Sequence, residues 1–136
     1  MKKEILIDLM DLDEHSGFGE IERMYANIFS KIDIPDMHFN FLVRDKQMNT
    51  YGEKVGYLKH RSIYKVFPFL ISRHFDLWHS VHQLYRECPR NKSTKRILTI
   101  HDLNFLYEKN EKKAKKYLNA VCKKINNAHH LVAISN

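Results

Sequence analysis

Ile97-Leu98-Thr99-Ile100, a short apolar run, leads directly into His101-Asp102-Leu103. Such a run is typical of a strand that is buried on both faces of a parallel sheet. Open α/β sheets bind ligands outside the carboxyl ends of their strands, so this strand would place His101 and Asp102 at a candidate site. The stretch therefore predicts a sheet and also the edge of the sheet at which function is expected.

Outward from this run, the chain alternates between two kinds of pattern. Apolar residues recur at three- and four-residue steps over residues 21–32 and 114–125, which predicts two amphipathic helices. The other segments with strand character are residues 5–9, 37–43, 76–81 and 130–134. Strands that alternate with helices are joined by right-handed crossovers, so the predicted fold class is α/β, a doubly wound, mainly parallel, Rossmann-like sheet. Residues 44–75 are less regular, with a short helix over 65–74 interrupted at Pro68.

Length and charge limit the class of protein. The 136 residues fit one domain. The longest apolar stretch falls short of the roughly 20 residues of a membrane span, and the start lacks a secretory pattern, so we expect a cytoplasmic protein.

A net charge of +7 favours anionic partners without choosing among nucleotide, nucleic acid and membrane. Residues 57–75 interleave aromatic with basic side chains, which fits core packing of the aromatics or, alternatively, a membrane or nucleic-acid surface. No RNA-binding signature is visible, so nucleic acid is not an expected partner.

Ser16-Gly17-Phe18-Gly19 comes after the first predicted strand and opens the first predicted helix. Backbone N–H groups at a helix start can receive a phosphate, which makes Gly17, Phe18 and Gly19 candidates for phosphate binding. An ordinary turn is the alternative, because the motif lacks the third glycine of a dinucleotide fingerprint. Several carboxylates surround it and would oppose a phosphate.

The histidines have both a functional and a structural interpretation. His101 could donate a hydrogen bond to a substrate or stabilise developing charge, or it could be a packed strand-end residue beside Asp102, which would cap the next turn. His79 or His82 could lie at the rim of the same cleft. A metal between those two is not expected, because residues three apart on a strand point to opposite faces. The two cysteines, Cys88 and Cys122, also lack metal-ligand spacing, so no metal and no cofactor are expected.

Taken together, three motifs resemble the N-terminal domain of retaining GT-B glycosyltransferases of the group-1 or family-4 class. They are Ser16-Gly17-Phe18-Gly19, Thr99-Ile100-His101-Asp102-Leu103 and Asn127-Ala128-His129-His130-Leu131-Val132-Ala133-Ile134-Ser135. Their order and spacing agree across nearly the whole chain. Two positions depart from the family pattern: Glu20 follows the second glycine, and His129 replaces a common Asp.

The resemblance implies that residues 1–136 form the acceptor-side half of a two-domain GT-B enzyme. The C-terminal donor-binding domain would be missing from this chain, which by itself would be inactive. The implied reaction transfers a sugar from a nucleotide-sugar donor to a glycan or lipid-linked acceptor in polysaccharide biosynthesis, with retained configuration and no metal. By resemblance, residues 17–19 would face the donor pyrophosphate, His101 would contact the transferred sugar, and Asp102 would orient the turn behind it.

Two further expectations accompany the resemblance. A doubly wound pattern would add a covering helix after the last strand, so we expect the chain to be a truncated piece of a larger polypeptide. A second possibility left open by the basic charge is that the protein binds peripherally to the inner face of an anionic membrane. The competing function is a non-enzymatic flavodoxin-like or receiver-like binding module, because doubly wound folds serve many functions.

Overall fold

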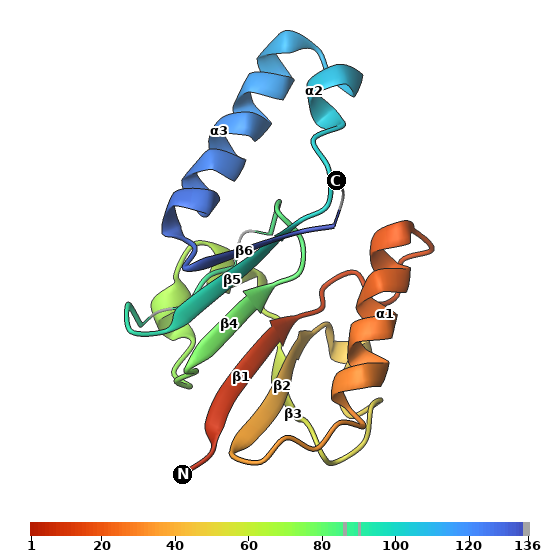
Figure 1. The fold of residues 1–136 in the computed structure, drawn as a ribbon, viewed down its shortest axis with the longest axis vertical. Helices are drawn as coiled ribbons and strands as arrows, with labels where there is room; N and C mark the ends of the chain where they lie inside the picture. The colour runs from red at the N-terminus through yellow and green to blue at the C-terminus, as the bar shows by residue number, and fades with distance from the viewer. Residues whose placement is uncertain (86, 90, 135–136) are drawn as a thin grey trace.

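A computed structural model describes residues 1–85, 87–89 and 91–134. Its described residues form one sheet of parallel strands in the order β3-β2-β1-β4-β5-β6 (Figure 1). The strands are β1 (Lys3–Asp8), β2 (Met37–Val43), β3 (Gly56–Lys59), β4 (Leu77–Ser80), β5 (Lys95–Ile100) and β6 (His130–Ala133). The order reverses between β1 and β4, which is where ligands bind in doubly wound sheets. The α/β, Rossmann-like fold class expected from the sequence is confirmed.

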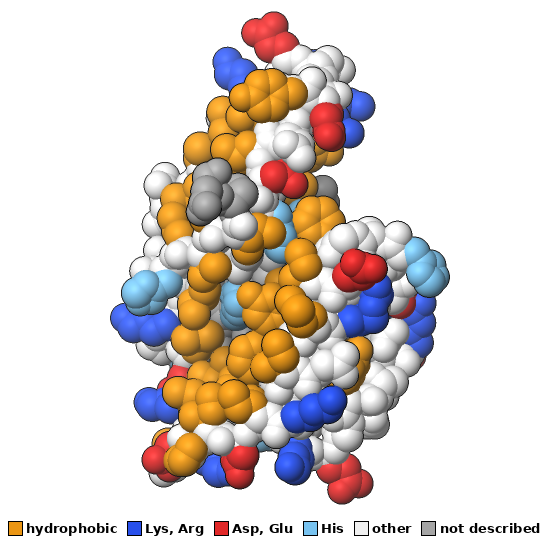
Figure 2. Space-filling model, turned by 45° about the vertical axis from the view of Figure 1, so that its right-hand side comes forward, with side chains coloured by type: hydrophobic (Ala, Val, Ile, Leu, Met, Phe, Trp, Pro, Cys, Tyr) orange, Lys and Arg blue, Asp and Glu red, His pale blue; other side chains and the backbone are white. Residues whose placement is uncertain are grey.

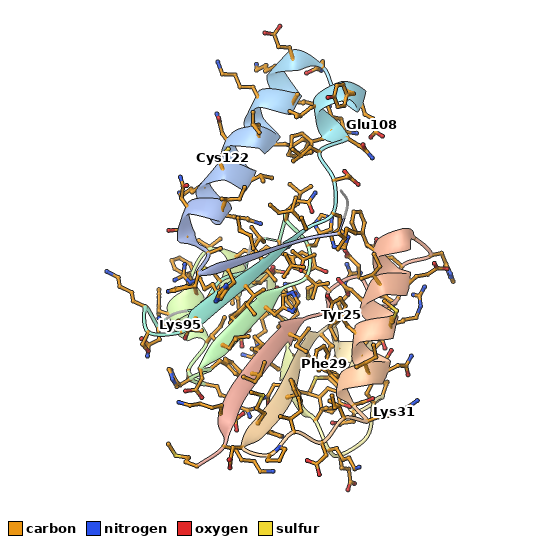
Figure 3. All side chains as sticks on the ribbon, in the orientation of Figure 1. Tyr25, Phe29, Lys31, Lys95, Glu108 and Cys122 are labelled. Atoms are coloured by element: carbon orange, nitrogen blue, oxygen red, sulfur yellow. The ribbon has the colours of Figure 1, made fainter. Side chains whose placement is uncertain are left out.

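Helices pack on both faces of this sheet. Helix α1 (Gly17–Phe29) connects β1 to β2, and α2 (Phe105–Glu108) and α3 (Glu111–Asn127) connect β5 to β6. Tyr25 and Phe29 point from α1 toward the sheet (Figure 3), and the Phe29 ring lies 4.8 Å from the Phe39 ring of β2. Helix α3 lies on the side of the opposite face, where its C-terminal half borders a cavity that Trp78 and Leu98 also line.

The alternation of side chains along β1 supplies both halves of the core. Ile5, Ile7 and Leu9 are buried against the α1 side, whereas Leu6 and Met10 pack with Trp78 and Phe75 on the other side. Burying each such side chain contributes roughly 1.5–3 kcal/mol relative to leaving it exposed. The register pairs Asp8 with both Leu42 and Ser80, so β2, β1 and β4 end level with one another. Their carboxyl ends form the edge that carries the site.

The irregular middle of the chain differs from its prediction. The sequence did not predict β3, which is only four residues long and half-buried at the edge of the sheet. Instead of a short helix over 65–74, the structure has two 3-10 turns, η2 (Ser62–Lys65) and η3 (Pro68–Leu70), the second of which begins at Pro68. A further 3-10 turn, η1 (Asp45–Gln47), follows β2. Proline has no N–H and starts the second turn, where no donor is needed.

The α1 face is only partly covered. Figure 2 turns the α1 side of the molecule toward the viewer and shows a band of apolar side chains on this face. Met24 and Ile28 of α1 are 56% and 50% exposed, and Val132 of β6 is 39% exposed. Among the described residues, no helix has the length and apolar character needed to cross a bilayer.

Candidate functional site

Three aromatic rings from distant parts of the chain meet at the carboxyl edge of the sheet. Phe18 is the second residue of α1, His82 follows β4, and His101 follows β5. The Phe18 ring stands edge-on to both imidazoles, with centroids 4.1 Å from His82 and 5.0 Å from His101. The two imidazole centroids are 5.8 Å apart. The structure therefore brings together the glycine-loop residue and the strand-end histidine that the sequence analysis singled out.

The position of the proton on His101 follows from its hydrogen bond. Nε2 of His101 lies 2.6 Å from the carbonyl oxygen of Val81. A carbonyl oxygen only accepts, so Nε2 carries the proton and donates it. In the neutral ring Nδ1 is then left as the acceptor. His101 is 5% exposed, so this nitrogen is held in a fixed, largely dry position.

Gln83 joins the ends of β4 and β5. The backbone N–H of His101 donates to Gln83 Oε1 at 3.0 Å, and Gln83 Nε2 donates to the carbonyl oxygen of Asp102 at 2.7 Å. One buried amide therefore fixes the backbone on both sides of the His101 side chain. Sequence reasoning missed Gln83, which lies in a loop and belongs to no motif. Asp102 itself accepts the Asn104 N–H at 3.0 Å through Oδ1, so its carboxylate shapes the turn behind His101.

His82 presents the complementary hydrogen-bonding group. Its Nδ1 accepts the backbone N–H of Leu84 at 3.0 Å, so in the neutral ring the proton is on Nε2. Burial lowers the pKa of His82 to about 4, with the nearby His101 adding to the effect, which keeps the ring neutral at physiological pH. No described residue hydrogen-bonds this Nε2. The Nε2–H is thus a donor that a ligand could use if the site opened.

His79 lies away from this cluster. Its Nε2 is 2.8 Å from Thr99 Oγ1, and its ring stands edge-on to Tyr25 of α1 with centroids 5.5 Å apart. Burial beneath α1 lowers the pKa of His79 to about 4. Because side chains alternate along β4, His79 points into the α1 face of the sheet, three residues before His82. The structure thus places His79 in the core, and only His82 of the pair reaches the edge.

The two glycines of the loop differ in what surrounds them. Ser16 caps α1 by accepting the Gly19 N–H at 3.2 Å. A Cβ on Gly19 would lie 2.1 Å from the carbonyl oxygen of Glu14 and 2.9 Å from that of Asp11. Gly19 is therefore required by the packing of the preceding loop. Gly17 is exposed and has nothing within 4 Å of the same position, so its backbone is the part of the motif open to a phosphate.

Ion pairs neutralise part of the acidic loop before α1. Asp13 pairs with Lys46, and Arg44 lies 3.7 Å from the Glu14 carboxylate. The Lys46 hydrogen bond lowers the pKa of Asp13 in spite of some burial. These cations come from the segment after β2. The sequence alone does not indicate that this segment lies beside the acidic loop. The repulsion that the carboxylates would exert on a phosphate is reduced accordingly, although Glu20 remains exposed at the helix start.

Two further carboxyl groups are buried behind the site. The Tyr85 hydroxyl donates to Glu22 Oε1, and the Asp11 N–H donates to Glu22 Oε2 at 2.7 Å. Burial raises the pKa of Glu22 to about 9, so this side chain is uncharged at neutral pH. Asp8 is fully buried, and neither of its carboxylate oxygens has a hydrogen-bond partner among the described residues. Burial, with the nearby Glu87 and Glu22, raises the pKa of Asp8 well above its usual value.

The site is closed in this conformation. His82 and His101 are 9% and 5% exposed beneath the half-buried Phe18 ring. Two cavities, of about 500 and 350 Å³, lie elsewhere and share Trp78, whose side chain is on the face away from α1. The described residues contain no cluster of three or more His, Cys, Asp or Glu arranged to hold a metal ion. A ligand would reach the imidazoles only after side chains that cover them move, and Phe18 is in contact with both rings.

No protein-family model, curated protein or solved structure matches the chain. The third motif of the sequence analysis lies on the edge strand β6, with Ser135 outside the described residues. His129, at its start, accepts the Arg96 N–H at 3.2 Å and has no contact with the ring cluster. The chemistry available at the edge therefore comes from Gly17, Phe18, His82 and His101.

Proposed function

We propose that this chain is the acceptor-side domain of a retaining glycosyltransferase, which transfers a sugar from a nucleotide-sugar to a glycan or lipid-linked acceptor in polysaccharide biosynthesis. The supporting observation is the convergence of Phe18, His82 and His101 at the switch point of the sheet. The proposal includes a donor-binding domain that faces this edge and holds most of the nucleotide. It also places the enzyme in the cytoplasm and requires no metal.

The hydrogen-bonding groups at the edge fit the charges of sugar transfer. The bond from the anomeric carbon to the phosphate oxygen breaks as the acceptor hydroxyl oxygen forms a bond to the same face of the sugar, so negative charge grows on the leaving phosphate, whose oxygen takes up the proton that the hydroxyl group loses. A fixed donor aimed at developing negative charge stabilises such a transition state. The His82 Nε2–H and the open backbone at Gly17, where the positive end of α1 lies, are donors of this kind.

His101 takes a different part in the proposal. The Val81 carbonyl occupies its Nε2–H, so a neutral His101 offers Nδ1 as an acceptor for a hydroxyl group. A sugar or acceptor hydroxyl that donates to Nδ1 would be oriented by a ring whose backbone is held by Gln83. Phe18 would move to admit the sugar and then exclude water from the reacting groups. Asp102 would position the turn through its bond to Asn104.

The strand order weighs against the competing function. Flavodoxin-like and receiver-like sheets have the order 2-1-3-4-5, whereas this sheet has the order 3-2-1-4-5-6 that is typical of dinucleotide-binding folds. A receiver also requires an accessible phospho-acceptor aspartate at a strand end. Asp8 ends β1 but is fully buried. The geometry therefore favours a nucleotide-linked substrate at the edge over a phosphorylated binding module.

The decisive experiment measures sugar transfer by the enzyme that contains this chain together with a donor-binding domain. We expect His101→Ala to lower kcat more than tenfold, which corresponds to about 1.4 kcal/mol of barrier. His129→Ala is the matched control, because that side chain is exposed and lies outside the ring cluster. A loss of less than tenfold for His101→Ala, or an equal loss in the control, would contradict the proposal.

A further inference from the structure

The stretch that contains β3 and most of the crossover to β4 has an unusual charge composition. Residues 54–75 contain no Asp or Glu, and they include Lys54, Lys59, Arg61, Lys65 and Arg73; Asp76, directly before β4, is the next acidic residue. The path runs through η2 and η3, and no α-helix lies on it among the described residues. The segment is thus a basic stretch in short, tight turns.

This segment divides its apolar side chains between the core and the solvent. Tyr64, Ile71 and Phe75 are 8%, 3% and 2% exposed, and they pack beneath the sheet with Trp78. These three anchor the turns. The remaining large apolar side chains of the turns are exposed: Ile63 47%, Val66 68%, Phe67 44%, Phe69 55% and Leu70 43%. Core packing therefore accounts for only part of the aromatic pattern seen in the sequence.

The exposed side chains form a patch. Five large apolar residues lie within the eight positions 63–70, and the rings of Phe67 and Phe69 are in contact, with centroids 5.6 Å apart. Single exposed apolar residues are ordinary on protein surfaces, but a contiguous group marks an interaction site. Tyr64, within these positions, and Ile71, directly after them, are buried and anchor the turns that carry the patch to the core.

The charges around the patch are mostly cationic. Arg61 is exposed and has no ion pair with a described residue, whereas Lys65 lies 3.9 Å from the buried Glu87 carboxylate. Further from the patch, Lys59 pairs with Asp45 at 2.7 Å and Arg73 pairs with Glu4 at 2.8 Å. Each of these three pairs also neutralises a basic side chain, so Arg61 is the one of these four cations that has no ion pair with a described residue. The patch would present apolar side chains and the unpaired Arg61 guanidinium to a partner.

We infer that residues 61–70, which we term the turn patch, bind the interface of an anionic lipid bilayer. Interfacial binding combines apolar side chains that enter the acyl boundary with basic side chains at the headgroups, and both are present on the turn patch. A nucleic-acid surface would instead depend on aromatic platforms for base stacking. Three of the five exposed apolar residues, Ile63, Val66 and Leu70, are aliphatic, which favours lipid. This surface does not depend on the sugar-transfer proposal.

Vesicle sedimentation tests the inference. The protein is mixed with vesicles of phosphatidylglycerol and phosphatidylcholine, or of phosphatidylcholine alone, and the bound fraction is measured. We expect binding to the anionic vesicles and at least a tenfold weaker partition coefficient for the double variant Phe67→Ser/Phe69→Ser. The matched control is Met24→Ser/Ile28→Ser, which removes equally exposed apolar side chains from α1. Circular dichroism confirms that each variant is folded, and Phe69→Ser alone replaces the double variant if that one is not.

A second pair of variants tests the charge. Arg61→Gln should weaken binding to anionic vesicles several-fold, and added salt should reduce this difference, whereas Lys31→Gln at the other side of the molecule should have little effect. Several outcomes would overturn the inference. They are no binding of the unaltered protein to anionic vesicles, equal losses in the turn-patch and α1 variants, and binding to single-stranded RNA but not to vesicles.

Discussion

Phe18 and His82 meet edge to face, with ring centroids 4.1 Å apart and ring planes at 80°. The contact joins the start of α1 to the end of β4, two segments separated by more than sixty positions. It places the Phe18 ring against an imidazole whose Nε2 has no hydrogen-bond partner among the described residues. Edge-on contacts of this kind contribute about 0.5–1.5 kcal/mol beyond area burial.

Replacing Phe18 should change the titration of His82. Burial lowers the pKa of His82 to about 4, so Phe18→Ala should raise that pKa toward the ordinary value near 6.5. Nuclear magnetic resonance titration of the imidazole protons measures the shift, and Phe18→Leu is the control that keeps most of the cover. If His82 titrates in Phe18→Ala as it does in the unaltered protein, Phe18 is not what shields it.

Gln83 should matter more for stability than its loop position suggests. Gln83→Ala removes the amide that accepts the His101 N–H and donates to the Asp102 carbonyl oxygen. Leaving those two buried backbone groups unpaired should lower the free energy of unfolding by about 1–3 kcal/mol. Urea denaturation measures the change, with Gln47→Ala in η1 as the control. A loss no larger than in the control would mean that water satisfies both groups.

The sequence predicted the framework because the framework depends on local patterns. The bounds of β2 agree with the predicted 37–43, and the apolar steps in 21–32 and 114–125 mark α1 and α3. Not every apolar step is buried: Met24 and Ile28 of α1 and Ile32, which follows the helix, are 56%, 50% and 42% exposed. A periodic pattern predicts a helix, but it does not predict which of the apolar side chains on the helix face will be buried by the rest of the protein.

The details of the site depend on contacts that no local pattern encodes. Gln83 has its role only because β4 and β5 end side by side, and Arg44 reaches Glu14 only because the segment after β2 returns to the first loop. Strand alternation predicted that His79 and His82 point to opposite faces, but the position of His82 beyond the end of β4 and its contact with Phe18 depend on the tertiary structure. His101 and Phe18 could be anticipated because each directly adjoins a predicted element.

The two glycines of the first loop should respond in opposite ways to alanine. Gly19→Ala would place a Cβ 2.1 Å from the Glu14 carbonyl oxygen, a backbone atom that cannot easily give way. We expect a loss of several kcal/mol or a protein that does not fold. Gly17→Ala meets nothing within 4 Å and should change stability by no more than about 1 kcal/mol in either direction. Thermal unfolding of both variants makes the comparison, and similar losses would contradict the assigned packing of Gly19.

Glu22 should make the protein less stable as the pH rises. Its pKa is about 9 in the folded state against 4.5 for the ordinary value, so between these values the unfolded chain binds fewer protons than the folded one. The free energy of unfolding then falls with pH, by at most about 1.4 kcal/mol per pH unit from this group. Glu22→Gln cannot titrate and keeps an acceptor for the Asp11 N–H, so its stability relative to the unaltered protein should increase from pH 5 to pH 9.

Urea denaturation at pH 5, 7 and 9 measures this difference between the two proteins. Asp8 is present in both, but Glu22 contributes to its raised pKa, so the pH dependence that differs between the two proteins belongs to Glu22 together with its effect on Asp8. Glu20→Gln, at an exposed position of the same helix, should keep the pH dependence of the unaltered protein. If Glu22→Gln is instead destabilised by the same amount at every pH, the buried carboxyl group is ionised in the folded state. The hydrogen bonds from Tyr85 and Asp11 would then be stabilising a charge.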